Sequence, residues 1–82
     1  MKRPAFPTLV DLAPGDAARV LEVHPGEEQR LAAEGLASGD RVVVETRLPL
    51  GGPIVVRVGR ARLAVARQVA AAIRVERQPG TR

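Results

Sequence analysis

The chain of 82 residues has no cysteine, no tryptophan and no tyrosine, and Phe6 is its only phenylalanine. The absence of cysteine excludes disulfides, thiolate-bound zinc, iron–sulfur clusters and cysteine nucleophiles. Without large aromatic side chains, the interior has to be packed with valine, leucine, isoleucine and alanine, and the stiff β-branched members of this set favour strands. Because 45% of the residues are apolar, the composition predicts one small globular domain with a sheet core.

Long apolar runs are also absent. The longest stretches, around 63–66 and 69–73, are separated by Arg67 and Gln68, and they are far shorter than the ~20 residues that span a bilayer. The basic start Met1-Lys2-Arg3 leads into prolines instead of an apolar segment, which is not the pattern of a secretory signal. We therefore expect a cytoplasmic protein.

Side chains suited to catalysis are scarce. The hydroxyl groups are those of Thr8, Ser38, Thr46 and Thr81, and His24 is the single histidine. A catalytic triad needs a histidine beside a nucleophile, and no local spacing in this sequence places them together. We expect no enzyme activity.

Basic residues outnumber acidic residues by thirteen to nine, which gives a formal net charge of +4. Such a surface could contact phosphate groups or an acidic partner, although a solvated barrel exterior carries similar charges. Single-strand binders interleave stacking aromatics with basic groups, so nucleic acid is not the expected partner, and a nucleic-acid-binding barrel is kept as the alternative. Six arginines load the C-terminal half with positive charge, and alternation places Arg57, Arg62 and Arg74 on outward faces. The six are Arg57, Arg60, Arg62, Arg67, Arg74 and Arg77.

Short strand patterns alternate with turn signals along the chain. Apolar residues recur at every second position in 54–58 and 61–65, on both sides of a Gly59-Arg60 turn, which is the pattern of a hairpin. In 17–24 the phase is mixed, since Val20 and Val23 cannot face the same side of a regular strand, and this predicts a bulge or burial on both faces. We expect strands over 17–24, 41–47, 54–58, 61–65 and 73–76, helical turns over 8–12 and 67–70, and one short helix over 27–34.

The helix expected over 27–34 has acidic residues in its first turn and Gly35 just beyond its end. Acids stabilise a helix N-terminus, and glycine readily adopts the left-handed conformation that ends a helix. Two turns are too short to be stable alone, so the helix has to dock on the sheet through Leu31 and Leu36. About five strands and one short helix predict a mainly β fold, a small barrel without exposed sheet edges.

Two glycine motifs stand in order among these strands. Gly35–Gly39 reads Gly-Leu-Ala-Ser-Gly, and Pro49–Pro53 reads Pro-Leu-Gly-Gly-Pro. With the strand pattern around them, they make residues 8–77 resemble the ferrous iron transport protein A (FeoA) family. We expect the remaining ends, 1–7 and 78–82, to be flexible.

Three positions depart from the family pattern. Glu34 stands where an apolar residue usually precedes the glycine, Ser38 replaces a common proline, and Gly52 stands where the loop often carries an aspartate. These departures affect loop contacts and leave the expected fold unchanged.

The resemblance implies an SH3-like β-barrel, a fold also found as the C-terminal domain of iron-dependent repressors. It further implies a non-enzymatic cytoplasmic accessory protein of ferrous iron uptake. The implied partner is the cytoplasmic G-protein region of the FeoB permease, so the protein would be peripheral to the membrane only through that partner.

The candidate partner-binding segment is the loop Leu48–Pro53. Two leucines in a proline-stiffened surface loop offer apolar area, and little chain entropy is lost when such a loop docks. The other interpretation is that both leucines fold back over the barrel end. The residues that we assign to partner binding are Leu48, Pro49, Leu50, Gly51, Pro53 and, on the basic face, Arg57.

His24, Glu27 and Glu28 form the one cluster in the sequence suited to a divalent metal, because imidazole and carboxylate ligands suit iron or manganese. They lie around a single strand-to-helix turn. The simpler interpretation needs no metal, since acids at a helix start stabilise its dipole. We expect no resident cofactor and at most weak divalent metal binding, and a metal-sensing module is a further alternative.

Overall fold

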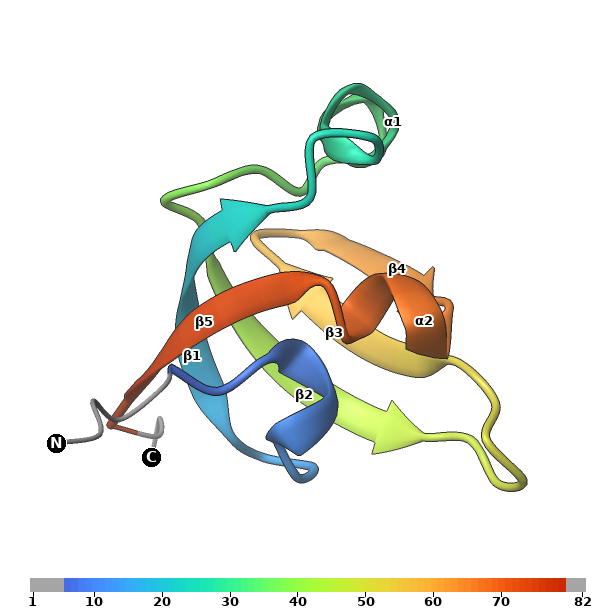
Figure 1. Cartoon of the computed structure of the whole chain (residues 1–82). Helices are drawn as coiled ribbons and strands as arrows, with labels where there is room; N and C mark the ends of the chain where they lie inside the picture. The colour runs from blue at the N-terminus through green and yellow to red at the C-terminus, as the bar shows by residue number, and fades with distance from the viewer. Residues whose placement is uncertain (1–5, 80–82) are drawn as a thin grey trace, which may run out of the picture.

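The computed structural model describes residues 6–79 (Figure 1). No helix in this range is both long enough and apolar enough to cross a membrane. Each element lies where the sequence pattern predicts it, although β5 extends two residues further. The strands are β1 (Ala17–Val23), β2 (Arg41–Arg47), β3 (Ile54–Val58), β4 (Ala61–Val65) and β5 (Ile73–Gln78), and the helical segments are the 3-10 turn η1 (Leu9–Asp11), α1 (Glu28–Ala33) and α2 (Arg67–Ala70).

The ends predicted to be flexible, 1–7 and 78–82, lie largely outside the described residues. Four residues assigned to them are described, and two of these four pair with the backbone of another segment. The carbonyl of Pro7 accepts a hydrogen bond from the N–H of Val75 (2.9 Å), and Gln78 pairs with Ala17 in the sheet.

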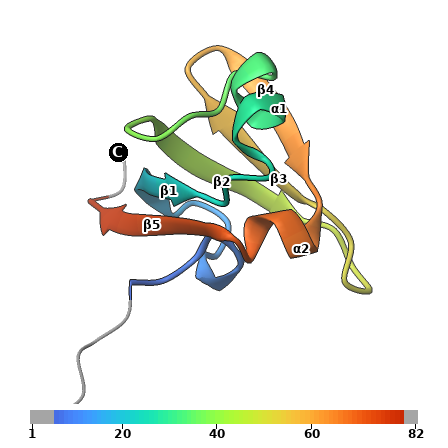
Figure 2. The ribbon, with the colours of Figure 1, turned by 45° about the horizontal axis from the view of Figure 1, so that its top comes forward.

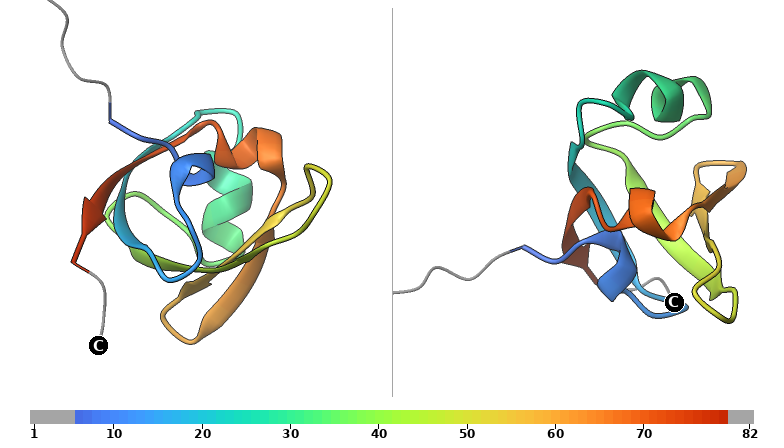
Figure 3. Two further views of the ribbon diagram at one scale, coloured as in Figure 1. Left: turned by 90° about the horizontal axis from the view of Figure 1, so that it is seen from below. Right: turned by 45° about the vertical axis from the view of Figure 1, so that its right-hand side comes forward.

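The five strands form one antiparallel sheet in the order β4-β3-β2-β1-β5. The sheet curls around its core, as Figure 3 shows from below, which confirms a mainly β barrel. One detail is wrong: within residues 6–79, β4 and β5 end the sheet without pairing with each other. The chain joins these two strands through α2, whose Ala70 is fully buried, and not through a hairpin turn.

A β-bulge in β1 explains the mixed phase of its apolar residues. The pairing of β1 with β5 shifts register between Val20 and Glu22, so Leu21 is the additional residue. Such a shift reverses the side of the sheet to which the following side chains point. Val20 and Val23 are therefore both buried, while Leu21 is half-buried, and the predicted bulge is confirmed.

The core consists of aliphatic side chains alone. Among the residues that the structure describes, every buried side chain belongs to leucine, isoleucine, valine or alanine, and none is polar or charged. Burying one such side chain fully contributes about 1.5–3 kcal/mol. The largest fully buried ones are Leu9, Leu12, Leu36, Ile54, Ile73, Val20, Val42, Val44, Val56 and Val75.

Helix α1 lies at one end of the curled sheet, and η1 lies at the other (Figures 1 and 2). Helix α1 docks on the sheet as predicted, because Leu31 and Leu36 are buried. Gly35 ends it with a φ of +105°. The N–H of Leu36 donates to the carbonyl of Leu31 (2.8 Å), and the N–H of Gly35 donates to the carbonyl of Ala32 (3.0 Å). This is the Schellman arrangement, in which a left-handed residue satisfies the last carbonyls of a helix.

Replacing Gly35 tests this helix end. A Cβ added at Gly35 would meet no atom within 4 Å, so the Gly35→Ala variant introduces backbone strain without a steric clash. We expect the free energy of unfolding to fall by about 1 kcal/mol. Urea unfolding followed by far-ultraviolet circular dichroism measures this change. Gly35→Asn is the matched control and should lose less, because asparagine tolerates positive φ; equal losses would contradict the explanation.

Candidate partner-binding surface

The loop between β2 and β3, called here the leucine loop (Leu48–Pro53), is closed by two backbone hydrogen bonds. The N–H of Leu48 donates to the carbonyl of Pro53 (2.9 Å), and the N–H of Gly52 donates to the carbonyl of Pro49 (3.1 Å). Inside the second bond lie Leu50 and Gly51, with φ of +61° and +72°. Two central residues at positive φ are characteristic of the type I′ turn, whose twist suits a hairpin. The leucine loop is therefore a tight turn with a defined shape.

Leu50 is the unusual residue of this turn. It is the only residue other than glycine with positive φ in the described part of the chain, and the left-handed conformation costs such a residue roughly 1–2 kcal/mol. Its side chain is fully exposed, at 102% of the reference value. No burial within residues 6–79 therefore offsets the strain. Of the two interpretations of this loop, folding back over the barrel end does not hold for Leu50.

Leu48 lies at the base of the turn and is 42% exposed. Its Cβ comes so close to Gly52 that a Cβ added there would lie 3.1 Å from it and 3.1 Å from the Pro49 carbonyl oxygen. A larger residue at position 52 would need these neighbours to move by a few tenths of an ångström. The close approach therefore favours the glycine that departs from the family pattern.

Arg47, the last residue of β2, anchors the base of the leucine loop. It pairs with the buried Ile54, and paired residues lie on the same face of a sheet. The side chain of Arg47 therefore points to the inner face. Its Nη1 donates to the carbonyl oxygens of Val10 (2.6 Å) and Leu12 (2.7 Å), which ties the end of η1 to the barrel. Sequence reasoning missed this role, because the inward direction of Arg47 depends on the register shift within β2.

Arg57, assigned to the same surface as the leucine loop, lies apart from it. It pairs with Val43, toward the opposite end of the β2–β3 hairpin. The register shifts between Val44 and Thr46, so Glu45 is a bulge residue. Its carboxylate lies 3.3 Å from Arg57 Nε and 2.7 Å from Arg62 Nε. The structure does not bring Arg57 and Leu50 together into one compact site.

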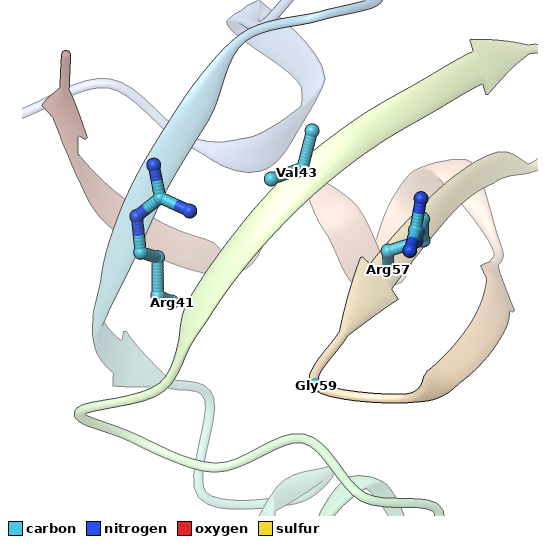
Figure 4. Close-up of a pocket in the computed structure, with 4 residues that line it drawn as sticks. All are labelled: Arg41, Val43, Arg57 and Gly59. Carbon is cyan, nitrogen blue, oxygen red and sulfur yellow. The ribbon is translucent and has the colours of Figure 1, made fainter. Parts of the chain in front are cut away.

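A hollow of about 430 Å³ lies next to Arg57 on the outer face of the sheet. Arg41 and Val43 of β2 line one side, and Arg57 and Gly59 line the other. Figure 4 shows the two arginines on either side of Val43, with Gly59 at the β3–β4 turn. We call it the basic hollow; sequence reasoning singled out Arg57 of this group but not Arg41.

The candidate metal ligands have other contacts. Nδ1 of His24 accepts a hydrogen bond from the N–H of Gly26 (3.0 Å). Arg30 donates a hydrogen bond to the carboxylate of Glu27 and forms an ion pair with it. The hydrogen bond, and then the negative charge, raise the pKa of Arg30. Within residues 6–79, no three side chains of histidine, aspartate or glutamate are placed to hold a metal ion. The structure thus does not bring His24, Glu27 and Glu28 together as ligands.

The FeoA domain model matches residues 8–77. The chain belongs to the FeoA family. This family is associated with ferrous iron transport, which agrees with the resemblance carried by the two glycine motifs. No curated protein matches the chain.

Solved FeoA structures are similar along most of the chain. A FeoA protein from Chlorobium tepidum is 34% identical with a TM-score of 0.80, and the match covers 92% of this chain and 73% of that one. A FeoA from Stenotrophomonas maltophilia, complexed with zinc and described as a prokaryotic SH3 domain protein, is 29% identical with a TM-score of 0.69, over 84% of this chain and 88% of that one. The SH3-like fold is thereby confirmed.

A manganese-dependent transcriptional repressor contains the same fold. It is 23% identical with a TM-score of 0.80, and the match covers 95% of this chain and 45% of the repressor. At this identity the likeness concerns the fold alone. It agrees with the expected relation between FeoA proteins and one domain of metal-dependent repressors.

Removing the donors of Arg47 tests its role as an anchor. The Arg47→Met variant keeps an apolar stem but leaves the carbonyls of Val10 and Leu12 without their partner. We expect the free energy of unfolding to fall by about 1–2 kcal/mol, since hydrogen bonds to a charged group are among the stronger ones. Urea unfolding measures this loss. Arg60→Met, at the exposed β3–β4 turn, is the control and should change stability by less than about 0.5 kcal/mol; an equal loss in both variants would contradict an anchoring role.

Proposed function

We propose that this FeoA-family protein is a cytoplasmic, non-enzymatic accessory of ferrous iron uptake. In this proposal it binds the cytoplasmic G-protein region of a FeoB-type permease, and the leucine loop is the main contact. The family's association with ferrous iron transport supports the assignment to iron uptake. The observation that carries the proposal is the exposed Leu50 in a strained turn.

The strain at Leu50 favours a role outside the fold. A single exposed leucine is ordinary on a protein surface. A leucine that also adopts positive φ is not ordinary, because asparagine or glycine would form the same turn at lower cost. Strained residues cluster at binding sites, where function retains what stability alone would not. We therefore take Leu50 as a residue kept for its side chain.

Docking of the turn on a partner would regain more than the strain costs. Burying a leucine side chain fully contributes about 1.5–3 kcal/mol. The hydrogen bonds across the leucine loop and the fixed φ of Pro49 and Pro53 hold the turn in one shape, so little entropy is lost on binding. An apolar pocket on the partner is the complementary feature.

The other assigned residues support Leu50 in different ways. Leu48 adds partly exposed apolar area at the base of the turn, and Gly51 supplies the second positive φ. Arg57 lies further along the outer face of β3, so it would extend the contact along the sheet.

Exchange of Leu50 separates binding from stability. The Leu50→Asn variant creates an Asn-Gly pair, the preferred sequence of a type I′ turn. We expect the free energy of unfolding to rise by about 0.5–1 kcal/mol, while affinity for the FeoB-type permease in detergent micelles falls at least about tenfold. Leu50→Asp should likewise lose binding, with a melting temperature close to that of the original protein.

Leu50→Met is the matched control for these variants. It keeps the apolar area and the backbone strain, so binding should stay within about threefold. Biolayer interferometry against the immobilised permease gives the affinities. Unchanged binding by Leu50→Asn would rule out the leucine loop as the contact, and a large fall in the melting temperature of Leu50→Asp would show that the side chain contributes to the fold.

A further inference from the structure

The basic hollow exists because position 59, on the outer face of the sheet, is a glycine and carries no side chain. Val42 pairs with Val58 and Val43 pairs with Arg57, so the register continued by one step places Gly59 opposite Arg41. A Cβ added at Gly59 would meet no atom within 4 Å. The space opposite Arg41 is therefore open, and it is continuous with the surface of Val43 and with Arg57.

Positive charge dominates this part of the sheet. Arg41 pairs across the ladder with Arg19, and like charges directly opposite each other repel. Arg19 faces Glu76 on its other side, which offsets its own charge. The guanidinium of Arg41 donates to the main-chain carbonyl of Pro79 (3.3 Å) and forms no ion pair within residues 6–79.

Arg57 already binds a carboxylate in this structure. It shares the carboxylate of Glu45 with Arg62, at 3.3 Å and 2.7 Å. Two guanidinium groups thus face one acid, and the side chain of Arg57 remains 59% exposed. A second carboxylate could approach Arg57 from the hollow, where Val43 offers an apolar floor.

We propose that the basic hollow binds an extended acidic segment of a partner protein, with carboxylates at alternate positions. Arg41 and Arg57 are diagonal neighbours on adjacent strands, and the Cα atoms of such neighbours are about 7–8 Å apart. In an extended peptide, side chains two residues apart point the same way and are separated by roughly 6.6 Å. One carboxylate of such a segment would pair with Arg41 and the next with Arg57. The methylene groups between them would contact Val43.

Nucleic acid fits this surface less well. Single-strand binders stack bases on aromatic rings, and the rings of Phe6 and His24 line a different hollow with Ala72. The floor of the basic hollow is aliphatic. Carboxylates on a flexible chain, in contrast, need only charge and correct spacing.

The inference rests on the proposed role in binding a partner protein, and it adds a second contact at the other end of the β2–β3 hairpin. Its test does not use the permease. The probe is a synthetic peptide of alternating serine and glutamate, and the same peptide with glutamine is the control ligand. Binding is followed through backbone amide shifts of the labelled 82-residue chain at low salt.

We expect the glutamate peptide to shift the amides around Arg41, Val43 and Arg57, and the glutamine peptide to have no effect. The Arg41→Gln and Arg57→Gln variants should each weaken binding about fivefold, as expected for one exposed ion pair. Arg67→Gln removes the same charge from the exposed surface of α2 and should stay within about twofold. Melting curves verify that all three variants fold.

Several outcomes would overturn the inference. Equal weakening by all three variants would show that only net charge matters. Tighter binding of a single-stranded oligonucleotide, lost in the same two variants, would assign the hollow to phosphate. Shifts in the hollow that change on dilution of the protein alone would assign it to a second copy. Failure of the peptide while Leu50→Asn still loses the permease would remove the basic hollow and leave the leucine loop in place.

Discussion

One additional residue in β2 governs how the two candidate surfaces are arranged. The register between β2 and β3 shifts at Glu45, and such an additional residue reverses the alternation of the side chains that follow it. Arg47 consequently points inward, where it holds the carbonyls at the end of η1. Glu45 points outward, where it pairs with Arg57 and Arg62. In a regular strand residues 45 and 47 would share one face, so Arg47 would point outward beside Glu45 and the anchor at the base of the leucine loop would be lost.

The leucine loop and the basic hollow lie at opposite ends of the same hairpin. Arg41 and Val43 of β2 line the hollow and the loop begins at Leu48, so the two surfaces lie roughly 15–25 Å apart along the strand. A single partner would have to span that length. The two surfaces also differ in chemistry. One offers a rigid apolar side chain for burial, and the other offers guanidinium groups for charge pairing. Contacts of the second kind guide association and orientation, while contacts of the first kind supply most of the affinity.

Much of the fold could be predicted because the signals are local. Alternation in β3 and β4 predicts the hairpin, and the clash of phase between Val20 and Val23 predicts the bulge in β1. The bulge at Glu45 could not be predicted in this way, since Val42, Val43 and Val44 are all apolar and carry no alternation that a shift could interrupt. The open edge between β4 and β5 was missed because whether two strands pair depends on the curvature of the whole sheet.

The sequence by itself determined the elements, the aliphatic composition of the core and the position of the Pro-Leu-Gly-Gly-Pro turn, because periodicity and turn residues act over a few neighbouring positions. Tertiary structure decided what those elements expose. Leu50 could have packed inward or outward, and only the closed turn shows that it points into solvent. Arg41 and Arg57 line one hollow beside Val43 only through the pairing of β2 with β3, because strand register joins residues that are far apart in the chain.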